Sequence, residues 1–177
     1  MRRMNFATFL RTSFTACALI SQYAFADETP TQAPETEFRF VGYRDGVQQI
    51  VDLAQELIGI RYRRSGNRPQ TGFDCSGFVG YVFREGVGLI LPRVSREIGK
   101  TGTPVSKDEL KVGDLVFFNT MRHAFSHVGI YLGDHLFVHA PQSGGAVRID
   151  DLKARYWIKR YSGARRMSEN AAFSMQR

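Results

Sequence analysis

The feature that most constrains the fold is a change in hydrophobic pattern near Gly113. Before it, apolar residues recur at three- and four-residue spacing over residues 45–58 and 75–87, which is typical of amphipathic helices. After it, short runs rich in Val, Ile, Phe and Tyr alternate with turn residues, which predicts antiparallel strands. These runs occupy residues 114–119, 127–133, 135–140, 146–152 and 159–167. Helices followed by strands predict an α+β fold, with the helices packed on an antiparallel sheet.

The first 26 residues have the features of a secretory signal peptide. A positive start with Arg2 and Arg3 precedes an apolar stretch, and Ala24-Phe25-Ala26 matches a small-x-small cleavage site. The stretch is too short and too interrupted for a transmembrane helix. We therefore expect an exported protein, periplasmic or extracellular, with no stable membrane insertion after cleavage. Lipid attachment at Cys17 is the alternative, but the residues before it lack the leucine of a lipid-attachment motif.

The rest of the chain divides into a linker, a domain and a tail. Residues 27–44 open with Pro, Thr and Glu, which predicts a flexible linker. Residues 45–167 hold the predicted helices and strands, and residues 168–177 are expected to form a loose tail. The 151 residues left after cleavage are enough for one domain with a real core. The basic charge suits an anionic environment such as a cell wall, and the absence of an Arg-rich stripe argues against nucleic acid.

One cysteine, Cys75, remains after signal cleavage. Exported domains usually pair their cysteines, so a single thiol is either a reactive group or a buried, inert one. Cys75 opens the second helical pattern, and Asp74 occupies the position of a helix cap. A helix N-terminus and a neighbouring imidazolium would both stabilise a thiolate. On that basis we expect the pKa of the Cys75 thiol to lie well below its ordinary value of about 8.5.

All four histidines fall between His123 and His139, which leaves two interpretations open. The spacing His-x-x-x-His occurs twice and could indicate zinc, but a metalloprotease pair needs a helix and a neighbouring Glu, and both are missing here. The alternative joins Cys75 to one histidine, with a second polar group fixing the imidazole tautomer. We expect His123 and His135 to be solvated loop residues.

Five motifs in order resemble the NlpC-type family of peptidoglycan cysteine endopeptidases. They read "GFDCSGFVGYVF", "LPRVSRE", "GDLVFF", "SHVGIYLGD" and "FVHAP" and cover most of residues 46–167. The resemblance is closest to exported murein endopeptidases. It implies a papain-like α+β domain, with peptidoglycan as the partner, that needs no metal or organic cofactor. We expect such a protein to be a monomer.

The resemblance also implies roles for individual residues. Cys75 corresponds to the nucleophile, His127 to the base and His139 to the third polar residue that orients the base. Four more positions fall near the oxyanion or substrate groove: Tyr62, Asp74, Ser76 and Arg93. This chain has Arg64-Ser65-Gly66 where the family often has Tyr-Gly-Gly. The difference concerns the local shape of the groove and hence the stem-peptide preference, and it leaves the triad of Cys75, His127 and His139 unchanged.

Two other functions fit the same residues. One is amidase or transpeptidase acyl transfer on the same Cys-His-His site, and the other is a non-catalytic module that binds the cell wall. The intact set of three residues argues against the second. The glycines on either side of the nucleophile, Gly72 and Gly77, would let an extended peptide approach the backbone closely.

Strand parity makes a sharper prediction for the hairpin that carries His127 and His139. Both side chains must lie on the same face of the hairpin to act on one cysteine. Side chains alternate between the faces along each strand, and in a regular antiparallel pair the two residue numbers of every directly opposed pair have the same sum. Because 127 and 139 are both odd, the two histidines share a face only if that sum is even. A plain two-residue turn makes the sum odd. We therefore predict a three-residue turn over residues 133–135, pairing Leu132 with Leu136, or a bulge with the same effect, and a positive φ at His135.

Overall fold

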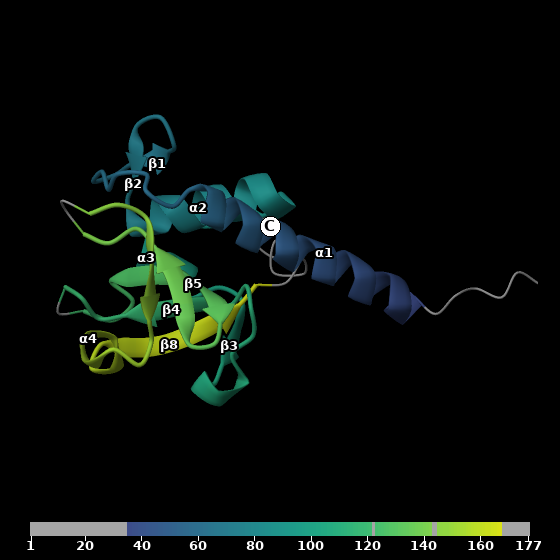
Figure 1. Ribbon diagram of the computed structural model, residues 1–177. Coiled ribbons are helices and arrows are strands. Elements are labelled where there is room, and N and C mark those ends of the chain that lie inside the picture. The colour runs from purple at the N-terminus through teal and green to yellow at the C-terminus, as the bar shows by residue number, and fades with distance from the viewer. Residues whose placement is uncertain (1–34, 122, 143–144, 168–177) are drawn as a thin grey trace, which may run out of the picture. The chain divides into compact units, whose positions relative to one another are not determined.

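The computed structural model describes residues 35–121, 123–142 and 145–167. The predicted signal peptide and tail lie outside the described residues. The helices are α1 (Glu35–Glu56), α2 (Cys75–Val87), α3 (Ser95–Ile98), α4 (Arg155–Ile158) and the 3-10 turn η1 (Lys107–Glu109). The strands are β1 (Asn67–Arg68), β2 (Gly72–Phe73), β3 (Thr103–Val105), β4 (Leu115–Phe118), β5 (His127–Gly133), β6 (Leu136–His139), β7 (Arg148–Asp151) and β8 (Tyr161–Arg166) (Figure 1). No helix among these residues is long and apolar enough to cross a membrane.

The sheet is antiparallel, with six strands in the order β3-β8-β4-β5-β6-β7, while β1 and β2 form a separate small hairpin. Each of the five predicted strand runs forms a strand, and the α+β prediction is confirmed. The short strands β1, β2 and β3 lie in segments for which the sequence pattern predicts no strand. They have two or three residues each, too few to show an alternating pattern.

The long helix α1 begins earlier than the sequence indicates. It starts at Glu35 rather than near Asp45, so residues 35–44 of the predicted linker are helical. The sequence between these two positions has no proline and only one glycine, so nothing in it stops a helix from extending toward the N-terminus.

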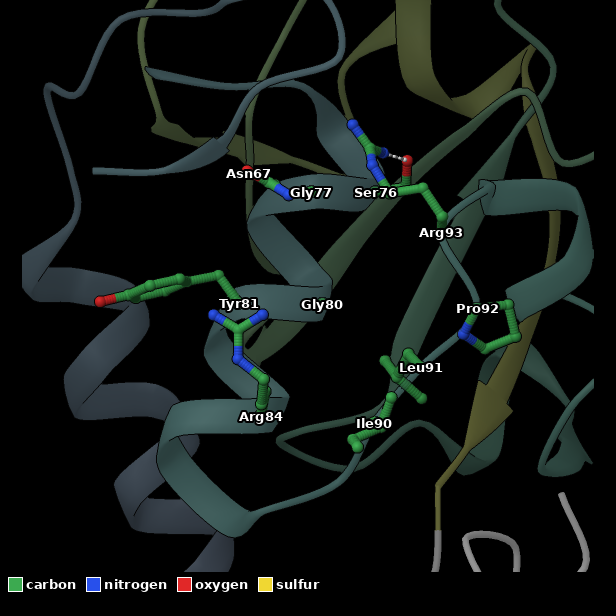
Figure 2. Close-up of a pocket in the computed structure, with 10 residues that line it drawn as sticks. All are labelled: Asn67, Ser76, Gly77, Gly80, Tyr81, Arg84, Ile90, Leu91, Pro92 and Arg93. Carbon is green, nitrogen blue, oxygen red and sulfur yellow. Dashed lines mark hydrogen bonds between the residues drawn. The ribbon is translucent and has the colours of Figure 1, made fainter. Parts of the chain in front are cut away.

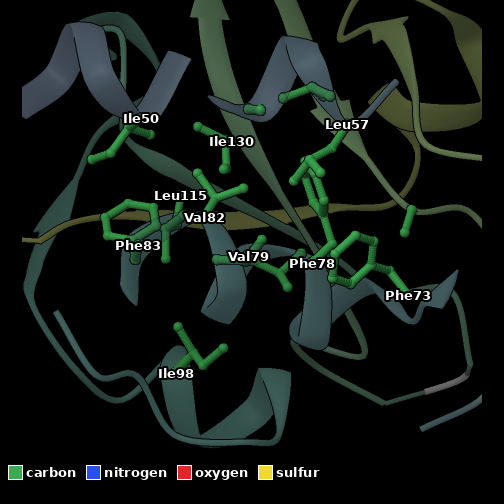
Figure 3. Packing of buried hydrophobic residues seen from close by; sticks show 14 of the residues in the cluster. Ile50, Leu57, Phe73, Phe78, Val79, Val82, Phe83, Ile98, Leu115 and Ile130 are labelled. Atoms are coloured by element: carbon green, nitrogen blue, oxygen red, sulfur yellow. The ribbon is translucent and has the colours of Figure 1, made fainter. Parts of the chain in front are cut away.

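Buried side chains cover both faces of the sheet. On one face, α2 packs on β5 and β6 and α1 packs on α2, and apolar residues from the helices and the sheet form the cluster in Figure 3. Ile50 comes from α1 and Leu57 from the turn directly after it, and Val79 from α2 belongs to the same cluster as Leu115 and Ile130 from the sheet. A smaller cluster fills the opposite face. It consists of Val116, Phe118, Tyr131, Phe137, Leu152, Trp157 and Ala164. The sheet therefore has a packed apolar layer on each face.

The hairpin between β5 and β6 confirms the even parity. Ile130 pairs with Val138 and Tyr131 with Phe137, but the last pair is Gly133 with Leu136, so the register shifts by one residue. Asp134 and His135 form the turn with φ values of 48° and 66°, so the positive φ predicted at His135 is confirmed. The pairing of Leu132 with Leu136 is wrong. A tight left-handed turn closes the hairpin, and a bulge before Gly133 restores the parity.

Candidate active site

The first turn of α2 is fixed by its cap. Asp74 has an extended conformation, and its Oδ1 accepts a hydrogen bond from the backbone N–H of Gly77 at 2.7 Å. The predicted cap is therefore confirmed, and Cys75 is the first residue of the helix. Cys75 is half-buried and is the only cysteine among the described residues. This placement leaves its thiol at the end of the helix where backbone N–H groups point outward.

The glycine after the nucleophile has a packing role that differs from our expectation. A Cβ on Gly77 would collide with the carbonyl oxygen of Gly66, because the loop before β1 crosses directly over the start of α2. The same carbonyl accepts the backbone N–H of Asp74 at 3.0 Å. Gly72 has a φ of +100°, and a Cβ there would lie 2.6 Å from the Arg61 carbonyl oxygen. Both glycines are thus required by close backbone contacts within the protein itself.

Arg93 binds the cap from the opposite side. Its two terminal nitrogens bind the two carboxylate oxygens of Asp74 at 3.0 and 2.7 Å, and one of them also donates to the hydroxyl of Ser76 at 2.9 Å. Such a bidentate pair restricts both partners more tightly than a single contact does. The structure therefore brings together three of the four residues that the resemblance placed near the oxyanion or substrate groove, Asp74, Ser76 and Arg93.

Next to this cluster lies a small pocket of about 100 Å³. Figure 2 shows Gly77 and Gly80 on the side of α2 that lines the pocket, with Tyr81 and Arg84 on one side and Leu91 and Pro92 on the other. The pocket shares Ser76 and Arg93 with the cap cluster, so it continues the surface beside Cys75.

The two histidines at the sheet meet in a buried contact. His127 begins β5 and His139 ends β6, and Nε2 of His127 lies 2.8 Å from Nδ1 of His139. Nε2 of His139 lies 2.9 Å from Oδ2 of Asp150 in β7. His127 is 6% exposed and His139 is fully buried. The three side chains form a continuous hydrogen-bonded row across three neighbouring strands.

Asp150 was not identified from the sequence. It lies opposite Phe137 in the β6–β7 pairing and so faces the same side of the sheet as His139, two residues further on. Arg148 donates to both of its oxygens at 3.0 and 3.1 Å. The sequence shows that residues 148 and 150 share one face of a strand, because they are two positions apart. It does not show the register of the β6–β7 pairing, which brings Asp150 beside His139.

Trp157 from α4 packs against the whole row. Its ring is stacked on His127, with centroids 5.6 Å apart, and meets His139 edge-on at 5.0 Å. Its indole Nε1 donates to Oδ2 of Asp150 at 3.1 Å. Since Trp157 is only 6% exposed, it also keeps water away from the two imidazoles.

Cys75 and the histidine row approach each other at the start of β5. The backbone N–H of Val128, the residue after His127, is close enough to the Cys75 sulfur to favour its thiolate. Tyr62 lies in the same environment, where burial and then the negative charges of Cys75 and Asp74 raise the pKa of its hydroxyl.

His123 and His135 are exposed, as expected. Within the described ranges, no group of three or more His, Cys, Asp or Glu side chains could hold a metal ion.

Comparison with known proteins decides the family. The model of the NlpC/P60 family matches residues 59–166 of this chain. The chain belongs to the NlpC/P60 family. The resemblance seen in the five motifs, and the papain-like fold that it implied, are thereby confirmed.

Individual NlpC/P60 proteins show the extent of the likeness. "Murein DD-endopeptidase MepS/Murein LD-carboxypeptidase" of Escherichia coli K12 is 42% identical over 146 residues, which cover 81% of this chain and 76% of that protein. "Murein DD-endopeptidase MepH" of the same organism is 42% identical over 115 residues, covering 63% of this chain but only 42% of MepH. The solved structure of the peptidoglycan hydrolase RipB from Mycobacterium tuberculosis has a TM-score of 0.63 at 28% identity, and the match covers 77% of this chain and 73% of RipB.

The protonation of this NlpC/P60 site differs from our expectation. Burial, and then the negative charge of Asp74, raise the pKa of the Cys75 thiol to about 11. Burial, and then repulsion from His139, lower the pKa of His127 to about 3. The expectation of a lowered thiol pKa is therefore wrong. Desolvation disfavours both charged forms and outweighs the stabilisation of the thiolate by backbone N–H groups, so the resting pair is a neutral thiol and a neutral imidazole.

Alkylation of Cys75 tests this protonation state. The rate constant for iodoacetamide should rise about tenfold per pH unit across roughly pH 7 to 9, because the thiolate fraction grows in that proportion below the thiol pKa. Intact-mass measurement of the modified fraction at each pH gives the rates. A rate that is already constant at neutral pH would show a preformed thiolate–imidazolium pair instead.

Proposed function

We propose that this protein is an exported cysteine endopeptidase that hydrolyses peptide bonds in peptidoglycan stem peptides or in their cross-links. The observation that carries the proposal is the placement of Cys75 at a capped helix start, beside the strand whose first residue, His127, is hydrogen-bonded to His139. The similarity to a murein DD-endopeptidase and to a peptidoglycan hydrolase supports the substrate class.

In the first half of the reaction His127 is the general base and Cys75 the nucleophile. His127 takes the thiol proton as the sulfur bonds to the scissile carbonyl carbon, and the carbonyl electron pair moves to oxygen. The backbone N–H of Cys75, together with the Tyr62 hydroxyl, is placed to stabilise that oxyanion. The C–N bond then breaks, His127 returns the proton to the leaving amine, and a thioester remains on Cys75.

In the second half a water molecule attacks the thioester. His127 takes one proton from the water, the C–S bond breaks, and the proton passes to the departing sulfur. Because burial keeps the pKa of His127 low, the imidazole is neutral and ready to accept a proton at neutral pH. The thiolate that forms transiently is strongly nucleophilic, since its conjugate acid has a raised pKa.

We assign Asp74, Ser76 and Arg93 to substrate binding at the rim of the site. The guanidinium, hydroxyl and carboxylate are linked to one another and lie beside the nucleophile. They would bind the polar backbone of a peptide rather than take part in bond cleavage. The similarity to murein DD-endopeptidases favours the cross-link as the bond that is cut.

Digestion of purified peptidoglycan tests the proposal. The full-length exported protein should convert cross-linked muropeptides into monomers, which mass spectrometry of the soluble products identifies together with the bond that is cut. Iodoacetamide should abolish the release of products, whereas EDTA should leave it unchanged. Inhibition by EDTA alone would favour the zinc alternative, and binding to the wall without products would favour a non-catalytic module.

A further inference from the structure

The row of His127, His139 and Asp150 has only one consistent arrangement of protons. Oδ2 of Asp150 receives the indole N–H of Trp157 and an N–H of Arg148, both of which are donors only. Hydrogen bonds from His139 and Arg148 outweigh burial and hold the pKa of Asp150 well below its ordinary value. Asp150 is therefore an ionised acceptor, and the contact at 2.9 Å requires a proton on Nε2 of His139.

The proton on His139 in turn determines the tautomer of His127. Burial lowers the pKa of His139, so its ring is neutral and its second nitrogen, Nδ1, has a lone pair. Nδ1 lies 2.8 Å from Nε2 of His127, and one of the two nitrogens must donate. Only Nε2 of His127 can do so. The lone pair of the neutral His127 ring is then on Nδ1.

We propose that Asp150 is a positioning residue that selects, through His139, the tautomer of His127 in which Nδ1 is the free base. Asp150 does this from a site remote from the reacting atoms, on the far side of His139. The inference rests on the proposed hydrolytic function, since it explains how the base of that reaction is held in one protonation state. Trp157 supports the arrangement by binding Asp150 and packing on both imidazoles.

Replacing the carboxylate with an amide of the same shape should disturb this row. In Asp150→Asn the negative charge is lost and only one acceptor oxygen remains. The amide N–H₂ must face either Nε of Arg148 at the Oδ1 position or the donors of His139, Trp157 and Arg148 at the Oδ2 position. Loss of the anion weakens the preference for a proton on Nε2 of His139 in the first orientation, and an amide nitrogen facing His139 reverses it in the second, so the proton on His127 moves in the same direction. We expect kcat for cross-linked muropeptides to fall about 10²-fold, the lower end of what a general base contributes.

Asp151→Asn is the matched control, because it makes the same change at the next residue of β7. Asp151 is exposed, and its carboxylate accepts only the backbone N–H of Lys153 among the hydrogen bonds of the described residues. We expect wild-type kcat and an unchanged melting temperature for this variant. Loss of activity in both variants would indicate a general effect of charge at this edge of the sheet and would contradict the proposal.

A spectroscopic measurement on the wild-type protein does not depend on the stability of any variant. Long-range ¹⁵N–¹H NMR spectra of the imidazoles should show protons on Nε2 and lone pairs on Nδ1 for both His127 and His139. In Asp150→Asn both rings should shift toward the tautomer with the proton on Nδ1. A proton on Nδ1 of His127 in the wild type, or unchanged tautomers in an inactive Asp150→Asn, would overturn the proposal. Unchanged kcat in Asp150→Asn would overturn it as well. A wild-type protein with the expected tautomers but no hydrolytic products would instead contradict the proposed function.

Discussion

Replacing Cys75 with alanine should abolish peptidoglycan hydrolysis, with a loss of at least about 10⁴-fold in kcat. Cys75 is the only thiol of the mature chain predicted from the sequence, and no other side chain in the described site could form a thioester. Cys75→Ser should be nearly as inactive, because the hydroxyl has a much higher pKa than the thiol and His127 therefore deprotonates it far less readily. Release of soluble muropeptides, measured by mass spectrometry, gives the result.

The fold of Cys75→Ala should be unchanged, because the thiol is half-buried and makes none of the hydrogen bonds that hold the α2 cap. Thermal unfolding followed by circular dichroism checks this. Full activity in a folded Cys75→Ala would rule out the mechanism, whatever the outcome for the histidines.

Gly77→Ala should destabilise the protein by about 3 kcal/mol. The new methyl group would meet the carbonyl oxygen of Gly66 and lie 3.0 Å from Oδ1 of Asp74. Neither atom can move away without breaking the hydrogen bonds that cap α2. The loop before β1 should therefore shift, and activity should fall because that loop lies over the start of the nucleophile helix.

Gly80→Ala is the matched control in the same helix, one turn further on. Nothing lies within 4 Å of a Cβ at this position, so the substitution should stabilise the protein by about 0.5–1 kcal/mol through its higher helix propensity. Urea unfolding of the two variants gives both free energies. Equal stability changes would show that the loop does not press on Gly77 in solution.

Much of this fold could be predicted from hydrophobic periodicity alone. The runs that became β4 to β8 have clear strand patterns, and the cap residue before Cys75 marks the start of α2. The parity of His127 and His139 even predicted an irregular hairpin between them. These features are local, or they depend on one short turn, so the sequence is sufficient to predict them.

The features that were missed depend on contacts between distant segments. Asp150 joins the histidine row only through the register of β7, which the loop before it does not determine. The collision that requires Gly77 comes from a loop eleven residues earlier. The thiol pKa was predicted in the wrong direction, because helix position and neighbouring charge are visible in the sequence and desolvation is not.

Trapping of the acyl-enzyme tests the central claim most directly. The wild-type protein is mixed with a purified cross-linked muropeptide, quenched in acid during turnover, and analysed by intact-mass and peptide mass spectrometry. The proposed mechanism predicts a thioester adduct with the mass of the acyl fragment, located on Cys75 and absent from Cys75→Ala. Products formed without an adduct under any quench time, or an adduct on another residue, would contradict it.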